Sequence, residues 1–336
     1  MKTALIFGIG GQDGSYLADL LLEKGYDVHG TSRRSSGDNL ARIAHCRGRV
    51  SLHRVDLADP YSVLTVLQSV SPDEVYNEAD QDHVGWSKAL PAYALQVTVG
   101  GPLAILEAMR FLQDQGGPDW KETKFFQPVS ATMFGAPTEF PQTESSPLDP
   151  RSPYACAKAH TYHLCRYYRR EHGLFVSTGI MYTHDSPRRG PGYLLQDLCY
   201  KGKFLQTAMQ ARLDSAVLRT GDPLTMVVGD PDAEVDVGFA GDYVNAAWQI
   251  LQLDKPNDFI ISTGETDRVG NIAEEVLRQF GVVGGRVVRD PDYPKSLNQG
   301  RLVGDYLKLH KATGWVPEVG TRDLIRLIRE AHNARP

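Results

Sequence analysis

The stretch ALIFGIGGQDGSYLADLLLEKG, residues 4–25, decides the fold of this chain. It opens with an apolar run that breaks at Gly8, and leucines then recur at helical spacing as far as Gly25. Glycine commonly ends a helix, whereas a short apolar run before glycines is typical of a buried strand. The stretch therefore predicts a strand, a tight turn and a helix.

The same alternation continues to about residue 182. Strand-like runs cover 27–31, 50–56, 73–77, 124–130 and 175–182, and helical patterns cover 60–70, 91–112 and 152–173. Alternating elements of these lengths favour parallel pairing with right-handed crossovers. We expect a doubly wound parallel α/β sheet of the Rossmann type over residues 1–182.

Beyond about residue 185 the rhythm loosens into turns rich in Gly and Pro, with helical patterns at 241–253, 268–280 and 321–333. We expect residues 183–336 to form a smaller, irregular substrate lobe. Within it, a strand and a helix from about residues 225–262 are expected to belong to the first domain. Ligands of open α/β sheets bind beyond the carboxyl ends of the strands, so both lobes should line one cleft.

Composition narrows the class of protein. The 336 residues are 41% apolar and 23% charged with a net charge of -5, which is typical of a soluble globular protein and gives no basis for binding nucleic acid. The four cysteines show no metal-ligand or disulfide spacing, so we expect reduced thiols and no metal. The opening apolar run is too short for a signal peptide or a membrane span, which predicts a cytoplasmic location.

The turn GIGGQDG predicts a dinucleotide site. Gly8, Gly11 and Gly14 follow the first strand and open the first helix, with Gln12 and Asp13 between them. Glycines let backbone N–H groups approach a pyrophosphate closely, and the helix N-terminus adds partial positive charge.

The end of the second strand bears on the choice of cofactor. Arg33 and Arg34 stand where a carboxylate would hold a free ribose hydroxyl, which favours NADP over NAD. The alternative is that the two arginines are a solvated surface pair. Asp56 and Leu57, at the end of the third strand, are expected to contact the adenine.

Tyr154 and Lys158 are the candidate catalytic pair. They lie four residues apart in SPYACAKAH and so share one face of a helix. A phenol loses its proton near pH 10, but a lysine ammonium beside it stabilises the phenolate. Ser130, at the end of the preceding strand, is expected to hydrogen-bond the same substrate oxygen.

These residues resemble the extended short-chain dehydrogenase/reductase superfamily. GQDGSYLADLLLEKGYDVHG, SPDEVYN, RSPYACAK, HDSPRRG and TGWVPEV are more closely similar to the GDP-mannose 4,6-dehydratase family. The resemblance implies hydride transfer from C4 of a nucleotide-bound hexose to NADP⁺ while Tyr154 takes the O4 proton. It also implies a homodimer or homotetramer, with helices 91–112 and 152–172 at a dimer contact.

Thr132 departs from that family. Its dehydratases carry a glutamate there that removes the C5 proton, and a threonine hydroxyl has no useful basicity. Ser130, Ala131 and Thr132 instead resemble UDP-galactose 4-epimerase. We therefore expect a 4-epimerase of a nucleotide hexose or heptose.

Alternative functions depend on the acidic stretch YNEADQDHV. Glu78, Asp80 and Asp82 stand where the dehydratases have apolar or small residues, and Asp82 is the best candidate for a relocated base. This would give a 4,6-dehydratase, unless the acids merely form a polar loop at the rim of the cleft. A 4-keto sugar reductase using Ser130, Tyr154 and Lys158, and a nucleotide-binding protein without activity, remain open.

The predicted nucleotide-sugar site is spread along the chain, and the nucleotide base and sugar stay open. Positive charge for the diphosphate is expected from Arg188 or Lys295, with Lys201 and Arg219 as further candidates. His160 and His163 share a helix but lack a third ligand, so we expect an interface or core position rather than a metal site. The other residues expected to contact substrate are Asp82, His83, Ser87 and Thr183.

Overall fold

Seven parallel strands form the central sheet of the structure, a computed structural model that describes residues 1–116, 122–214, 224–293 and 301–334. In spatial order they are β11 (Asp258–Ile261), β6 (Val176–Met181), β5 (Lys124–Ser130), β4 (Glu74–Asn77), β1 (Thr3–Phe7), β2 (Asp27–Ser32) and β3 (Ser51–Arg54). Chain order reverses between β1 and β4, which is the point where ligands bind in doubly wound sheets. The predicted Rossmann-type fold is confirmed.

The first strand shows why helices cover both faces. Ala4 and Ile6 pack with the core beneath α1 (Gln12–Glu23), α8 (Ala240–Leu251) and α10 (Leu307–Thr313). Leu5 and Phe7 pack with the opposite core, beneath α2 (Pro60–Val70), α5 (Gly101–Gly116) and α6 (Pro153–Glu171). Successive strand side chains point to opposite faces, so a continuous apolar run needs a helical layer on each side.

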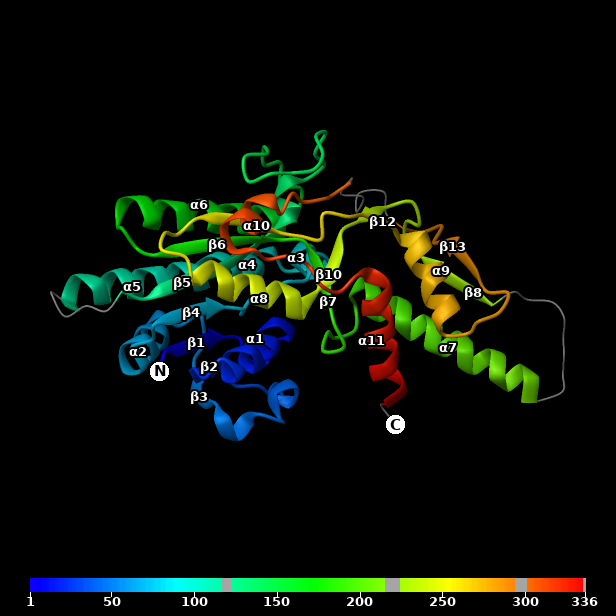
Figure 1. The fold of residues 1–336 in the computed structure, drawn as a ribbon, viewed down its shortest axis with the longest axis horizontal. Helices are drawn as coiled ribbons and strands as arrows, with labels where there is room; N and C mark the ends of the chain where they lie inside the picture. The colour runs from blue at the N-terminus through cyan, green and yellow to red at the C-terminus, as the bar shows by residue number, and fades with distance from the viewer. Residues whose placement is uncertain (117–121, 215–223, 294–300, 335–336) are drawn as a thin grey trace.

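A second core lies beside the sheet. It is built by α7 (Leu194–Asp214), α9 (Val269–Gln279), α11 (Thr321–Ala334) and the parallel pair β8 (Thr225–Val228) and β13 (Arg286–Arg289), which gather on the right of Figure 1. The irregular lobe expected after residue 185 is therefore more helical than its turns suggested, because α7 was not anticipated. The division at residue 182 stays a prediction, although β11 and α8 do join the first core.

Short paired segments connect the two cores. β7 (Thr183–Asp185) runs parallel to β10 (Val237–Phe239), and β9 (Glu234–Val235) pairs antiparallel with β12 (Asp267–Arg268). β7 directly follows β6 and lies near the middle of Figure 1. Residues 183–189 are thereby carried past the carboxyl end of the sheet.

The helix expected over 91–112 is not uniform. It consists of α4 (Pro91–Leu95), a π-helical turn (Gln96–Gly100) and α5, and it follows the short helix α3 (Val84–Ala89). Residues Pro91–Gly116 have the length and hydropathy of a membrane span, and half of the window tested is buried inside the protein. A buried core helix passes the same test, so we draw no membrane assignment from it.

The start of helix α6 is clearly marked in the local sequence. The hydroxyl of Ser152 accepts a hydrogen bond from the Ala155 amide, and Pro153 occupies the first helical position. Both choices favour a helix start, because serine satisfies a free N–H and proline supplies a helical φ angle. This start places Tyr154 in the first turn, one turn before Lys158.

Candidate active site

The glycine turn has the geometry of an anion site. Gly8 has φ +79°, and a Cβ there would lie 2.7 Å from the Ala79 nitrogen. A Cβ on Gly14 would lie 2.4 Å from the Gly8 oxygen, so neither position accepts a side chain. Gly11 begins α1, and no side chain of the described residues caps that helix end. The free N–H groups of the helix start therefore suit a pyrophosphate.

Gln12 and Asp13 are engaged within the protein. The Ser186 hydroxyl donates to Gln12 Oε1 at 2.8 Å, and Asp13 Oδ2 pairs with His184 Nε2 at 3.1 Å. Burial opposes the charge of Asp13, but His184, Arg189 and Gln12 outweigh it and lower its pKa to about 2. The two side chains thus fasten the glycine turn to the segment after β7, which contributes His184 and Ser186.

The candidate adenosine residues follow the ends of β2 and β3. Arg33 and Arg34 are exposed, and Arg33 Nη1 donates to the Tyr93 hydroxyl at 3.0 Å. Asp56 is also exposed, whereas Leu57 is buried. Two accessible guanidinium groups at this edge of the sheet fit a ribose phosphate. The uncapped glycine turn and this pair therefore fit a nicotinamide dinucleotide.

Ser130, Thr132 and Tyr154 come together at the end of β5. The Thr132 hydroxyl donates to Ser130 Oγ at 3.0 Å, and Tyr154 is 8% exposed. Burial raises the pKa of Tyr154 to about 12, against the Lys158 charge and a Ser130 hydrogen bond, which lower it. The structure thus brings together the hydroxyl groups expected to handle one sugar oxygen.

Lys158 lies beneath Tyr154 and is held by two oxygens. Its Nζ donates to the Pro128 carbonyl at 3.0 Å and pairs with Asp80 Oδ2 at 2.5 Å. Burial works against its charge, but Asp80 and Tyr154 prevail and hold the Lys158 pKa above its usual value. Nothing in the local sequence singled out Asp80 as the partner of this lysine.

Asp82 stands at the rim of the same group. Its side chain is 46% exposed, and it accepts hydrogen bonds from Arg189 Nη2 at 2.9 Å and from the Tyr193 hydroxyl at 2.8 Å. Burial and the Asp80 charge raise the Tyr154 pKa most, and the Asp82 charge raises it further. Asp82 is therefore close enough to Tyr154 to act on it electrostatically. His83 Nδ1 accepts the Trp86 amide at 3.1 Å and so begins α3.

Glu78 is the third acid of this stretch and differs from the others. Its Oε1 atom is buried and has no hydrogen-bond partner among the residues that the structure describes. Burial and the nearby Asp13 charge raise the Glu78 pKa to about 8, while His184 and Lys158 oppose the rise. A carboxyl group in this position keeps its proton near neutral pH.

We expect Glu78→Gln to stabilise the protein at alkaline pH. The pKa of Glu78 is about 8 in the folded protein and 4.5 in the unfolded chain. The folded state therefore loses stability relative to the unfolded state as pH rises from 4.5 to about 8. Glu78 as a whole is only partly buried, although its Oε1 atom is buried, so solvent reduces the effect. The gain at pH 9 should be on the order of 2 kcal/mol, with little change near pH 4. Denaturant unfolding of Glu78→Gln and of Glu139→Gln, an exposed control, measures it. Equal pH dependence in both variants would contradict the Glu78 assignment.

Several residues expected to contact substrate lie elsewhere. Ser87 is fully buried, donates to the Val84 carbonyl and accepts the Tyr154 amide at 3.2 Å, so it supports the start of α6. Thr183 is exposed in β7, and the Lys201 ammonium binds the Val227 carbonyl at 2.7 Å. Lys295 and Arg219 lie outside the described residues, and His160 and His163 are exposed on α6.

Arg188 points to α1 rather than to the candidate catalytic residues. It pairs with Asp19 at 2.6 Å, donates to Ser15 Oγ at 3.2 Å and lies over the Tyr16 ring. These contacts occupy the guanidinium that we expected at the diphosphate. Its neighbour Arg189 faces Asp82 instead. The sequence SPRRG alone does not indicate which of its two arginines lies near which acid.

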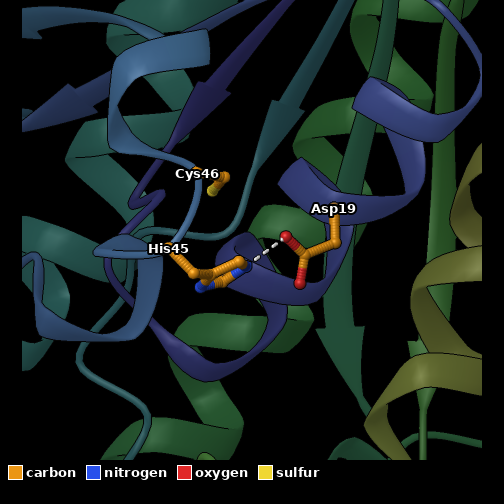
Figure 2. A group of neighbouring side chains, drawn as sticks. All are labelled: Asp19, His45 and Cys46. Atoms are coloured by element: carbon orange, nitrogen blue, oxygen red, sulfur yellow. Dashed lines mark hydrogen bonds and ion pairs between the residues drawn. The ribbon is translucent and has the colours of Figure 1, made fainter.

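Figure 2 shows Asp19 with His45 and Cys46, a group outside the catalytic residues. His45 Nε2 pairs with Asp19 Oδ1 at 2.7 Å, and the other Asp19 oxygen receives Arg188. Burial raises the pKa of the Cys46 thiol, whereas metals bind thiolate. The carboxylate is already balanced by its neighbours, so we assign this group to holding α1 against residues 41–49.

Comparison with known proteins confirms the resemblance seen in the sequence. The family model for GDP-mannose 4,6 dehydratase matches residues 5–328. GDP-mannose 4,6 dehydratase 2 of Arabidopsis thaliana is 38% identical over 340 residues, which cover 97% of this chain and 86% of the relative.

Solved structures of the same fold carry nicotinamide cofactors. UDP-glucose 4-epimerase of Thermus thermophilus, in complex with NAD, has a TM-score of 0.81 at 25% identity and covers 99% of this chain and 100% of its own. RMD of Pseudomonas aeruginosa, in complex with NADPH, has a TM-score of 0.78 at 22% identity, with 100% of both chains covered. The family model over residues 5–328 and the 38% identical relative together mean that the chain belongs to the GDP-mannose 4,6-dehydratase family, within the extended short-chain dehydrogenases/reductases.

Proposed function

We propose that this protein is a 4,6-dehydratase of a GDP-mannose-type nucleotide sugar in which Asp82 replaces the missing glutamate at Thr132. The observation that carries the proposal is the Asp82 carboxylate, which lies at the rim of the Ser130–Tyr154–Lys158 group and is open to solvent. The family model and the curated relative favour this reading over the 4-epimerase expected from the sequence.

In the proposed reaction each residue either transfers a proton or holds a reacting group in place. Tyr154 removes the O4 proton as C4 is oxidised, with Ser130 hydrogen-bonding the same oxygen and Lys158 beneath. Oxidation makes the C5 hydrogen acidic, and Asp82 takes that proton and passes it to the departing 6-hydroxyl, which leaves as water. C5 then takes up one proton as hydride arrives at C6, which balances the proton lost from O4. A bound nicotinamide dinucleotide would accept the C4 hydride and return it at C6.

We also propose NADP as the cofactor. The glycine turn at Gly8, Gly11 and Gly14 would hold the pyrophosphate, and Asp56 would face the adenine. The support for the 2′-phosphate is the exposed pair Arg33 and Arg34 at the end of β2, with no acid beside them in the sequence.

A 4-epimerase is the second candidate, and two observations favour it. Thr132 has no basicity and is hydrogen-bonded to Ser130, while the residues for C4 oxidation are complete. In addition, the Arg189 guanidinium and the Tyr193 hydroxyl both contact the Asp82 carboxylate, so its oxygens are already engaged by protein groups. An epimerase needs no C5 base.

Mass spectrometry of the products separates these functions. The protein is incubated with GDP-mannose and a panel of nucleotide hexoses and heptoses, with NADP or NAD. We expect a product lighter by one water, and faster turnover with NADP than with NAD. A product of unchanged mass would contradict dehydration and support epimerisation, whereas turnover that requires added reduced cofactor would support the 4-keto sugar reductase.

We propose further that two copies pair through the layer containing α3–α6. Large apolar side chains are exposed along these helices: Trp86, Leu90, Tyr93, Leu95, Leu103, Phe111 and Tyr167. Exposed apolar patches of this kind mark interfaces. Light scattering of the protein used in the product assay is expected to give the mass of a dimer or a tetramer, and a monomer at assay concentration would contradict the pairing.

A further inference from the structure

Asp80 is a buried acid in direct contact with the candidate catalytic lysine. Its side chain is 14% exposed, that of Lys158 is 5% exposed, and the two charged atoms lie 2.5 Å apart. The carboxylate is itself fixed from two further directions, since Thr98 Oγ1 and the Gln81 amide donate to Oδ1 at 2.5 Å and 2.7 Å. Thr98 lies in the π-helical turn, so three separate segments converge on this ion pair.

The ion pair leaves Lys158 little freedom. The Lys158 ammonium donates a hydrogen bond to the Pro128 carbonyl and forms an ion pair with the Asp80 carboxylate, with Nζ 5.7 Å from the centre of the Tyr154 ring. A lysine held by two oxygens in a buried site keeps one side-chain conformation. The ammonium is therefore held in one position relative to Tyr154.

Asp80 also changes what Lys158 does to Tyr154. A lone cation beside a phenol promotes loss of its proton, whereas a cation paired with a carboxylate has nearly no net charge. Among the residues that the structure describes, the acids that act on Tyr154 and Lys158 are Asp80 and Asp82, with Glu78 acting on the lysine. The Tyr193 hydroxyl also faces Tyr154, and the Cys165 thiol on α6 faces Lys158. Two acids on the loop after β4 thus oppose the single ammonium, and burial adds to their effect on the Tyr154 pKa.

We propose that Asp80 is a positioning residue that locks Lys158 between two oxygens and neutralises the charge with which the lysine would otherwise stabilise the Tyr154 phenolate. This inference rests on the proposed roles of Tyr154 and Lys158, but not on whether the product is a dehydrated sugar or an epimer. Asp80 contacts the lysine rather than the sugar oxygen, so it acts through Lys158.

The pH profile of turnover tests the proposal. For the wild type, Asp80→Asn and Asp80→Glu, kcat/KM is measured against pH with the sugar and cofactor that the product assay identifies. We expect the acidic limb of Asp80→Asn to lie about one pH unit or more below that of the wild type. Asp80→Glu keeps the charge and should keep the limb, and Asp114→Asn, which removes an exposed acid of α5, should leave it unchanged. An unmoved limb in Asp80→Asn would overturn the inference.

A second readout needs no substrate. The absorbance of tyrosinate is titrated in the wild type and in Asp80→Asn, each against the same protein carrying Tyr154→Phe, so that the difference reports Tyr154 alone. The Tyr154 transition should move to lower pH in Asp80→Asn by a similar amount, and coincident transitions would refute the role of Asp80 even if dehydration is confirmed. A shift without any dehydrated product would refute the proposed function and leave the role of Asp80 standing.

Asp80→Asn leaves a buried ammonium without its counter-charge, which can prevent folding. The comparison is then made between Lys158→Met and Lys158→Met combined with Asp80→Asn, where no unpaired ammonium remains. Tyr154 should ionise at lower pH in the double variant than in Lys158→Met. Equal midpoints in these two proteins would overturn the inference in the same way.

Discussion

Replacing Tyr154 by phenylalanine is expected to reduce turnover of the nucleotide sugar by about 10²–10⁴-fold, the usual contribution of a positioned acid or base. The change removes the hydroxyl that would take the O4 proton and keeps the ring in its buried site. Steady-state product formation measures the loss. Cofactor affinity, measured by fluorescence titration, should be unchanged, because the glycine turn is separate from this side chain.

The matched control is Tyr167→Phe, which makes the same chemical change at a tyrosine on α6 that is 48% exposed. The backbone amide of Tyr154 keeps its hydrogen bond to Ser87 in the Phe variant, so helix α6 should begin as before. Full turnover by Tyr154→Phe would remove the tyrosine from the proposed reaction. Loss of turnover in both variants would indicate a folding effect instead.

Replacing Asp82 by asparagine is expected to reduce formation of the dehydrated product by about 10²–10⁴-fold, while C4 oxidation continues. Asparagine cannot take the C5 proton, but it is close in size and can still accept the Tyr193 hydroxyl. Product mass measures dehydration. Exchange of the C5 hydrogen in heavy water should disappear in parallel, and a single-turnover rise in reduced-cofactor absorbance should remain.

A rescue experiment distinguishes a lost base from a disturbed loop. Thr132→Glu places a carboxylate where the relatives' pattern has one, so combined with Asp82→Asn it should restore part of the dehydration. Asp38→Asn, a change at an exposed acid near β2, should leave the product unchanged. Undiminished dehydration by Asp82→Asn would show that another group removes the C5 proton.

The amino-acid sequence was sufficient for the framework because its signals are local. The apolar run before Gly8 and the leucines after it predict strand and helix from neighbouring residues alone. Ser152 and Pro153 likewise mark the start of α6, and with it the four-residue spacing of Tyr154 and Lys158. The failures were also local. The apolar positions of α7 lie among turn-rich segments, and a π-helical turn interrupts the long helix around Thr98, just before Gly100, Gly101 and Pro102, which were the local sign of the interruption.

By itself, then, the sequence determined the sheet, the glycine turn, the spacing of the candidate pair Tyr154 and Lys158, and the presence of threonine rather than glutamate at position 132. Tertiary structure decided the charges around that pair. Asp82 contacts Arg189, which is 107 residues away in the chain, and Asp80, in the loop after β4, contacts Lys158 of α6. Adjacent residues such as Arg188 and Arg189 separate only when their segment is folded over α1. Electrostatic effects depend on distance in space and on burial, and neither quantity is a property of a short stretch of sequence.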